Sequence, residues 1–340
     1  MRLGLVGYGV GGRCFHAPFI MAATGVELVG IVARADKTIA AIKADFPAIP
    51  IYASLTQMLA AGVDIVTITT PPQTREALVL EAANAGVHVI ADKPFAPDAQ
   101  GARVLQKAAL DNGITLGVFH NRRYDTDLQT LKKLIDSDRL GKIWRVHSCM
   151  DFNDPITIEA GESGGVLRDL GSHLIDQMLW LLGPVTSVNA QLDYVKLAAG
   201  NTVAGFTLTL IHSNGVHSHL SASKLNCIEQ RELRVYAQKG YYVSNYTDVQ
   251  AQAIFSGKKP AMDLDNWGIE LEENWGTLST ATGMQKIPSE QGRYHDYYSQ
   301  FAEAVMSGGQ PPVSAEEAIA TLEVIDAAYR SAKTAETIKL

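Results

Sequence analysis

Short apolar runs alternate with longer amphipathic segments through the first third of the chain. The apolar runs predict strands, and the amphipathic segments between them predict helices with one buried face. Alternation of this kind predicts βαβ units that build a parallel, doubly wound sheet. The predicted strands cover residues 3–6, 28–32, 65–69, 88–91 and 115–119, and the predicted helices cover 13–23, 37–45, 55–61, 75–85 and 98–112.

The pattern changes after residue 119, where most strand candidates follow one another directly. Successive strands predict a mainly antiparallel sheet, and Asn214-Gly215 between two of them indicates a hairpin. We therefore expect an α/β domain over residues 1–120 and an α+β domain with an open sheet over 121–340. The last helix should pack back on the first domain. The later strands cover 146–151, 188–195, 202–212, 216–223, 231–237 and 240–244, and the later helices 124–137, 167–182, 294–307 and 315–334.

Composition narrows the class of protein. The 340 residues suffice for two domains with cores, and 46% hydrophobic against 19% charged residues is typical of a soluble globular protein. The net charge of -7 argues against nucleic acid as a main partner, and no apolar stretch is long enough to cross a membrane. Three widely spaced cysteines and the absence of an apolar leader favour the cytoplasm, and their spacing gives no metal-site pattern.

A glycine turn follows the first strand. Gly7, Gly9 and Gly12 fill the G-x-G-x-x-G pattern between a predicted strand and a predicted helix. Gly7 permits the tight turn, Gly9 lets the main chain approach a pyrophosphate, and Gly12 lets helix and strand pack closely. The helix N-terminus would then direct free N–H groups at the phosphates. We expect Gly7, Tyr8, Gly9, Val10 and Gly12 to bind a dinucleotide; the alternative is an ordinary glycine-rich turn.

Two further strand ends carry candidate residues. Thr70-Pro71 ends one predicted strand and Asp92-Lys93-Pro94 ends the next, and such carboxyl ends line the ligand crevice of open α/β sheets. We expect Thr70, Pro71, Asp92 and Lys93 to contact the cofactor, with Lys93 polarising a substrate oxygen or joining a proton relay. The alternative for Lys93 is a surface lysine in a turn. The bond before Pro94 is a candidate for a cis peptide.

The predicted helix 167–182 carries a candidate base. At 100° per residue, Asp169, His173, Asp176 and Trp180 share one face, and the aliphatic residues Leu174, Ile175, Met178 and Leu182 share the opposite one. A carboxylate one turn from an imidazole fixes its tautomer and raises its basicity, which suits a base that takes a hydroxyl proton. The alternative is a surface helix with a chance Asp–His pair.

Polar donors also follow the strand at 115–119. His120, Asn121 and Arg122 come directly after it and predict a domain junction that faces the substrate. The alternative for Arg122 and Arg123 is a structural ion pair.

These motifs, in this order, resemble the glucose–fructose oxidoreductase, inositol dehydrogenase and rhizopine-catabolism (Gfo/Idh/MocA) family over essentially the whole chain. The family's [ED]-K-P motif matches Asp92-Lys93-Pro94, and its D-x-G-x-H-x-x-D motif matches the stretch from Asp169 to Asp176. Phe15-His16-Ala17-Pro18 and the stretch after His120 look like a bacterial subgroup that includes scyllo-inositol dehydrogenases. The resemblance implies a Rossmann domain followed by a domain with an open, mostly antiparallel sheet.

The resemblance also implies an activity. Lys93, Asp169 and His173 would be catalytic in an NAD(P)-dependent dehydrogenase acting on a polyol or sugar, and the same three residues with His120, Asn121 and Arg122 would bind the substrate. Alternatives are a nucleotide-sensing regulator on the same fold and a reductase of a non-sugar substrate such as an enone or imine. The family implies a homodimer or homotetramer with its sheets packed face to face, and the threonine parity of strand 202–212 suits such a contact.

Two positions depart from the family. Arg168 stands where the subgroup usually has an aromatic residue, and Gln73-Thr74-Arg75 stands where many members carry a histidine. Both departures weaken any transfer of substrate identity.

The end of the second strand bears on the choice of cofactor. An NAD enzyme usually offers Asp or Glu there to the ribose hydroxyls, but this chain has Ala33-Arg34. Because Arg34 can bind a 2′-phosphate with a fork of N–H groups, the sequence favours NADP. Asp36, two residues further on, keeps NAD open.

Overall fold

The computed structural model describes residues 1–161, 164–198, 200–245 and 248–340. The chain divides into two compact units. The first contains residues 1–121, 250–267 and 293–319, and the second contains 122–249, 268–292 and 320–340. Two late segments therefore belong with the first unit, and the last helix has its first five residues in one unit and the rest in the other.

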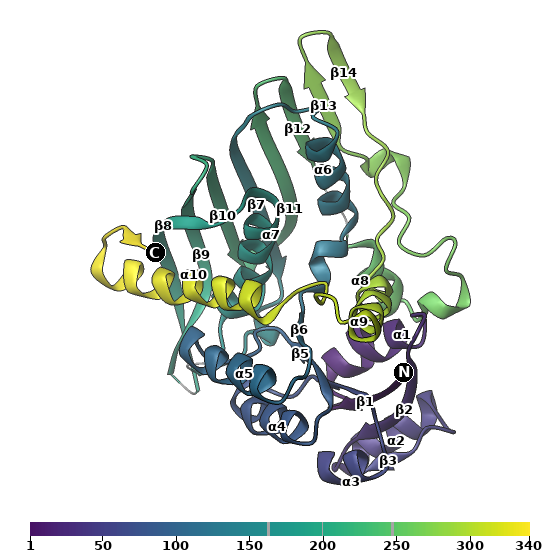
Figure 1. The fold of residues 1–340 in the computed structure, drawn as a ribbon. Coiled ribbons are helices and arrows are strands. Elements are labelled where there is room, and N and C mark those ends of the chain that lie inside the picture. Colours follow the sequence, from purple (N-terminus) through teal and green to yellow (C-terminus); the bar gives the residue numbers. More distant parts are fainter. Residues whose placement is uncertain (162–163, 199, 246–247) are drawn as a thin grey trace. The chain divides into compact units, whose positions relative to one another are not determined.

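The first unit is built on a six-stranded parallel sheet with strand order β3-β2-β1-β4-β5-β6, which confirms the predicted doubly wound, Rossmann-type fold (Figure 1). The strands of the first unit are β1 (Arg2–Val6), β2 (Glu27–Val32), β3 (Ile51–Tyr52), β4 (Ile65–Ile68), β5 (His88–Asp92) and β6 (Leu116–Phe119). The strand β3 was not predicted because it has only two residues. The helices of the first unit are a π-helical turn (Gly11–His16), α1 (Ala17–Ile20), α2 (Asp36–Asp45), α3 (Leu55–Ala60), α4 (Pro72–Asn84), α5 (Ala99–Asp111), α8 (Val249–Phe255, from residue 250), a 3-10 turn (Pro260–Met262) and α9 (His295–Ser307).

Aromatic and main-chain contacts attach the late segments to the sheet of the first unit. The Val118 N–H donates to the Val313 carbonyl, so residues 313–314 run beside β6. Phe119, at the end of β6, packs edge-on against Tyr297 of α9 at 5.0 Å between ring centroids. Long-range packing therefore defines this unit, and such packing leaves no local signal in the sequence.

The second unit is built on a nine-stranded sheet with order β14-β13-β12-β11-β7-β10-β9-β8-β15. Neighbouring strands are antiparallel except β7 and β10, which confirms the mostly antiparallel sheet. Helices α6 and α7 cover one face (Figure 1). The strands are β7 (Ile143–Asn153), β8 (Val185–Leu197), β9 (Gly200–His212), β10 (His217–Ser223), β11 (Leu225–Ala237), β12 (Gly240–Ser244), β13 (Thr277–Thr280), β14 (Gly283–Lys286) and β15 (Ile338–Lys339). The helices are α6 (Thr126–Asp136), a π-helical turn (Leu167–Gly171), α7 (Ser172–Leu182) and α10 (Ala315–Thr334), with 3-10 turns at Asn121–Tyr124, Pro155–Thr157 and Glu272–Asn274.

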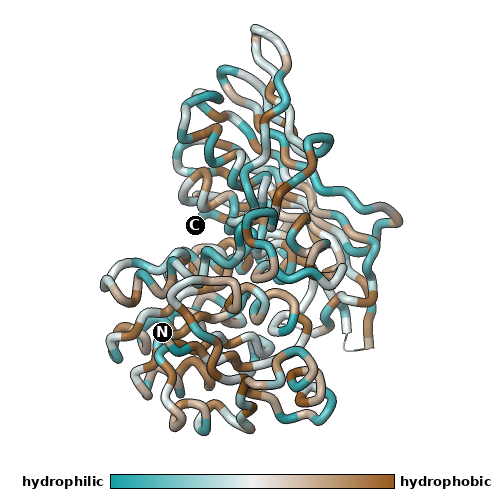
Figure 2. The backbone as a smooth tube through the Cα atoms, turned by 90° about the vertical axis from the view of Figure 1, so that its right-hand side faces the viewer, coloured by the Kyte–Doolittle hydropathy of each residue, from teal (hydrophilic) through white to brown (hydrophobic). Residues whose placement is uncertain are grey.

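Side-chain parity in β9 shows which face of this sheet is covered. Phe206, Leu208 and Leu210 are at most 2% exposed, whereas Thr207 lies exposed and Thr209 half-buried on the opposite face. Along the chain, hydrophobic stretches alternate with hydrophilic ones in both units (Figure 2). The sheet thus has one apolar face under helices and one open face of mixed polarity.

Within the described residues, no helix is both long enough and apolar enough to cross a membrane.

Candidate functional site

The glycine turn after β1 has the geometry of a phosphate-binding turn. Gly7 has φ of 103°, which disfavours any residue with a Cβ, and a Cβ on Gly12 would lie 2.3 Å from the Gly7 carbonyl oxygen. A Cβ on Gly9 would meet nothing within 4 Å, so space is open beside its main chain. Val10 is exposed and the Thr70 hydroxyl is buried without a hydrogen-bond partner among the described residues. These features fit a bound dinucleotide.

A side-chain clamp holds this turn against the end of α2. The Tyr8 hydroxyl donates to Asp45 at 2.8 Å, and the Arg13 guanidinium donates to both oxygens of the same carboxylate at 2.7 and 3.1 Å. Burial and the hydrogen bond to Asp45 raise the pKa of the Tyr8 hydroxyl well above its ordinary value, so it remains a donor at neutral pH. No local pattern predicts this clamp, because Asp45 lies 32 residues after Arg13.

Basic side chains lie where β2 leads into α2. Ala33 is buried, Arg34 is exposed, and Asp36 is the first residue of the helix. Ala35 caps the helix without a side-chain hydrogen bond, so main-chain N–H groups of the first turn stay open to a ligand. Lys37 is exposed beside them. Cations at a helix N-terminus can hold a phosphate.

The carboxylate of Asp92 organises the end of β5. It accepts from Thr69 Oγ1 at 2.8 Å and from the Lys93 main-chain N–H at 2.8 Å, and His16 Nε2 lies 3.2 Å away. His16 Nδ1 lies 2.6 Å from the Tyr298 hydroxyl. Burial alone would raise the pKa of Asp92, but His16, Arg75 and Lys93 together hold it below its ordinary range. The carboxylate therefore stays ionised and fixes the main chain at Lys93.

Arg75 joins the two strand-end turns. Its buried guanidinium donates to the main-chain carbonyls of Thr70, Asp92 and Pro94. The Lys93–Pro94 peptide is cis, the form the sequence left open. Arg75 thus has a structural role at one position where the chain departs from the family pattern.

The second unit places Asp169 and His173 at the start of the helix that the sequence predicted. Leu167–Gly171 is π-helical and α7 begins at Ser172. His173 is 5% exposed, and the Asp169 side chain is 39% exposed. Asp169 Oδ2 accepts from the ammonium of Lys224 at 2.8 Å. Sequence reasoning missed Lys224 because it follows Asp169 by 55 residues and belongs to no motif.

The carboxylate of Asp176, which lies one turn after His173 in α7, is held by an arginine from an earlier segment. It is 1% exposed and accepts two hydrogen bonds from the Arg123 guanidinium, at 2.9 and 2.7 Å. His173 and Asp176 both lie within α7, so the π-helical turn before it changes only the phase of Asp169 relative to them. Arg123 and Asp176 therefore form the structural ion pair that the sequence left open for this arginine.

Arg122 also lies in an ion-pair network. It contacts Asp125 at 3.1 Å and Asp248 at 2.8 Å, and Arg231 contacts Asp248 from the other side at 2.9 Å.

His120 and Asn121 are 2% and 7% exposed. Arg168 stacks over the Tyr329 ring at 5.3 Å.

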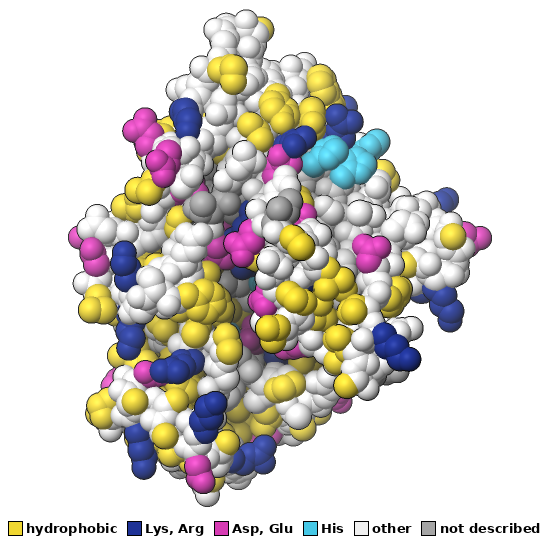
Figure 3. All heavy atoms as spheres, turned by 180° about the vertical axis from the view of Figure 1, so that it is seen from behind, with side chains coloured by type: hydrophobic (Ala, Val, Ile, Leu, Met, Phe, Trp, Pro, Cys, Tyr) yellow, Lys and Arg dark blue, Asp and Glu magenta, His cyan; other side chains and the backbone are white. Residues whose placement is uncertain are grey.

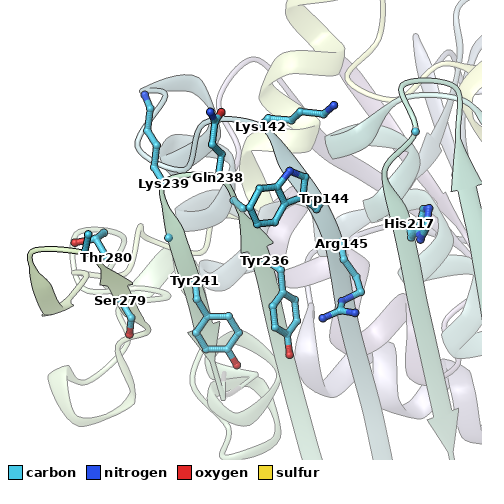
Figure 4. Close-up of a pocket in the computed structure, with 14 residues that line it drawn as sticks. Lys142, Trp144, Arg145, His217, Tyr236, Gln238, Lys239, Tyr241, Ser279 and Thr280 are labelled. Carbon is cyan, nitrogen blue, oxygen red and sulfur yellow. The ribbon is translucent and has the colours of Figure 1, made fainter.

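The open face of the large sheet carries a pocket of about 830 Å³ with aromatic and basic side chains (Figure 4). Arg145 stacks on Tyr236 at 4.2 Å, and Tyr236 lies 4.9 Å from Tyr241 between ring centroids. His147 and His219 follow on the neighbouring strands with their rings 4.7 Å apart. In the view turned by 180° from Figure 1, histidine, basic and hydrophobic side chains lie close together at the upper right (Figure 3). The pocket contains none of the residues predicted to bind cofactor or substrate.

A Rossmann sheet with a glycine-rich turn, followed by a second unit with an open sheet, is an architecture of NAD-binding oxidoreductases. Family models agree: residues 1–120 match the oxidoreductase family with an NAD-binding Rossmann fold, and residues 128–243 match the GFO/IDH/MocA C-terminal domain. The chain therefore belongs to the Gfo/Idh/MocA oxidoreductase family, which confirms the resemblance seen in the sequence.

Individual relatives span the full chain. It is 31% identical to scyllo-inositol 2-dehydrogenase (NADP(+)) IolW of Bacillus subtilis, over 100% of this chain and 96% of the relative. It is 30% identical to the uncharacterised oxidoreductase YdgJ of Escherichia coli, over 100% and 99% of the two chains. Among solved structures, Bacillus subtilis YvaA matches with a TM-score of 0.92 at 31% identity, covering 100% of this chain and 98% of that one.

Proposed function

We propose that this protein is an NADP-dependent dehydrogenase that interconverts a secondary alcohol of an inositol-like polyol or sugar with the corresponding ketone. One observation carries the proposal. The chain matches scyllo-inositol 2-dehydrogenase (NADP(+)) over its full length. It also carries all three candidate catalytic residues: Lys93 directly after β5, Asp169 in the turn before α7, and His173 in α7.

The cofactor would be held by the first unit. The turn residues Gly7, Tyr8, Gly9, Val10 and Gly12 would bind the pyrophosphate, and Ala33 with Arg34 would bind the adenosine end. Thr70, Pro71, Asp92 and Lys93 would contact the nicotinamide end. When bound, NADP supplies the acceptor or donor of the hydride. The exposed Arg34 beside an open helix N-terminus favours a 2′-phosphate, which NAD lacks.

The chain's own residues would handle the proton and the substrate oxygen. During oxidation, His173 takes the hydroxyl proton, and Asp169 orients its ring and stabilises the resulting positive charge. Lys93 donates a hydrogen bond to the same oxygen and polarises it. His120, Asn121 and Arg122 would bind the remaining hydroxyls. Fixing alcohol, base and cofactor in one geometry supplies much of the rate.

We further propose a cytoplasmic homodimer, or a tetramer of such dimers, formed through the open sheet face. All three cysteines are free, and Trp144 is 54% exposed on that face beside Tyr236 and Tyr241. An aromatic, partly apolar surface of this kind suits a self-complementary contact. Light scattering at micromolar concentration should give at least twice 36.7 kDa, and Trp144→Asp should lower that mass. A wild-type monomer would contradict the assembly.

A substrate screen tests the activity. Inositols, aldoses and ketoses are each incubated with NADP or NAD in the matching redox form, and the nicotinamide absorbance is followed. We expect turnover with a polyol or its ketone, and a preference for NADP. Cofactor binding without any turnover would favour the nucleotide-sensing regulator, and turnover confined to enones or imines would favour the non-sugar reductase.

A further inference from the structure

The ammonium of Lys224 lies against the proposed catalytic carboxylate. Lys224 sits between β10 and β11 and is 7% exposed. Its Nζ donates to Asp169 Oδ2 at 2.8 Å, and to Thr157 through Oγ1 at 3.0 Å and the carbonyl at 3.3 Å. Side-chain burial of a lysine is costly unless its charge is paired. The hydrogen bonds to Asp169 and Thr157 offset the cost of burying the Lys224 charge.

Main-chain bonds fix the place from which Lys224 reaches Asp169. Its N–H donates to the Ala204 carbonyl at 3.1 Å, and its own carbonyl accepts from the Asp154 N–H at 3.2 Å. The ammonium thus projects from a segment tied on two sides to the sheet and to the turn before Pro155–Thr157. A cation held in this way presents a fixed charge to the partly exposed carboxylate of Asp169.

Two neighbouring charged residues have partners of their own. Arg168 stacks over Tyr329, and Asp176 is paired with Arg123. The Lys224 ammonium is hydrogen-bonded to Asp169 and carries a full positive charge to it.

We propose that Lys224 is a positioning residue of the dehydrogenase: it keeps Asp169 ionised and holds it in one rotamer, so that Asp169 can orient His173. The inference rests on the proposed function and extends it to a residue outside the family motifs. A charge-assisted hydrogen bond from Lys224 fixes one oxygen of the Asp169 carboxylate and so restricts the rotamer of the side chain. Without Lys224, the carboxylate would gain rotational freedom and lose a favourable electrostatic partner.

Steady-state and pre-steady-state kinetics of Lys224→Gln and Lys224→Met test this role. We expect kcat to fall by roughly 10- to 100-fold, the usual cost of losing a group that orients a reacting one, with the NADP dissociation constant unchanged. Lys224→Arg should recover most of the loss because it keeps the charge. Lys224→Gln also serves if Lys224→Met does not fold, since the amide can still bond to Thr157.

Two matched controls separate catalysis from structure. Thr157→Val removes a loop contact of Lys224 but leaves the bond to Asp169, and it should retain wild-type kcat. Lys239→Met removes a lysine that pairs with Asp138 on the surface, and it should also have no effect on kcat.

A double variant decides whether Lys224 acts through Asp169. If Lys224 acts only through Asp169, the double variant Asp169→Asn/Lys224→Gln should lose no more activity than Asp169→Asn alone. Multiplied losses, or a Thr157→Val variant as slow as Lys224→Gln, would overturn the inference and make Lys224 a loop anchor. Wild-type turnover with unimpaired Lys224 variants would overturn the inference alone; a wild-type enzyme inactive on every polyol would overturn the proposed function as well.

Discussion

The two units hold their functional side chains by different means. In the first unit, the main chain does most of the positioning: a glycine turn shapes the phosphate site, and main-chain carbonyls accept from Arg75 to fix the turns around Lys93. In the second unit, ion pairs between distant residues do it. Arg123 reaches Asp176 across 53 residues, and Lys224 reaches Asp169 across 55.

This difference determines which substitutions should matter and how. Lys93 can lose its side chain while its turn keeps its geometry, because Arg75 and Asp92 hold the main chain there. A buried ion pair that loses one partner leaves an uncompensated charge inside the unit. Loss of Lys93 or Arg34 in the first unit should therefore alter rate or binding, whereas loss of one partner of the Arg123–Asp176 pair in the second should chiefly alter stability.

The largest expected effect is on the rate. Lys93→Met should lower kcat by roughly 10²- to 10⁴-fold, because it removes the group that polarises the substrate oxygen. The turn that carries Lys93 is fixed by Asp92 and Arg75, so the cofactor dissociation constant should stay within about threefold by fluorescence titration. A proportional loss of cofactor affinity would mean that Lys93 serves binding and not chemistry.

Removing the buried arginine should chiefly lower stability. Arg123→Met leaves the Asp176 carboxylate buried and unbalanced, which should cost about 3–5 kcal/mol of unfolding free energy in a denaturant titration. The control is Lys132→Met, whose partner Asp136 lies one helical turn away on the surface; we expect a loss within about 0.5 kcal/mol. Equal effects of the two variants would remove the distinction between the units.

Arg34→Ala should weaken NADP and spare NAD. A charge-assisted hydrogen bond to the 2′-phosphate is worth roughly 1.5–3 kcal/mol, or about 10- to 150-fold in the dissociation constant. Lys43→Ala, at an exposed position further along α2, should change neither cofactor. If Arg34→Ala weakens both cofactors equally, the arginine supports the adenine or the fold.

The smallest effect concerns the open sheet face. Burial first, and then neighbouring cations, lower the pKa of His147 and of His219 below the ordinary value of 6.5. Both bind protons less readily when folded, so their contribution to stability is present above pH 6.5 and is lost as the pH falls below it. The wild-type melting temperature should drop a few degrees more between pH 7 and pH 5 than that of His147→Asn/His219→Asn. His217→Asn should leave the contribution of His147 to this slope unchanged and reduce that of His219, whose pKa His217 also lowers.

Local patterns in the sequence were sufficient for much of the fold. The βαβ alternation, the glycine turn and the parity of β9 depend on neighbours within a few residues, and each was correct. Very short strands such as β3 and β15 lack enough residues to show a period.

What could not be predicted depends on residues that meet only in the folded chain. The partners of Asp169, Asp176 and Asp45 come from distant segments that no motif contains. The π-helical turn at Leu167–Gly171 was not predicted for a local reason, because a π-helical turn and an α-helical turn have similar sequence patterns. The motifs therefore identify candidate catalytic residues, and the structure adds the groups that hold them.

Transfer of deuterium tests the central claim most directly. The polyol selected by the substrate screen is deuterated at the reacting carbinol carbon and mixed with wild-type enzyme and NADP in a single turnover. We predict that deuterium appears at nicotinamide C4, that reduction is slower than with the unlabelled polyol, and that His173→Ala binds NADP normally but gives no rapid reduction. Rapid reduction by His173→Ala, or reduced cofactor without the label, would contradict the account.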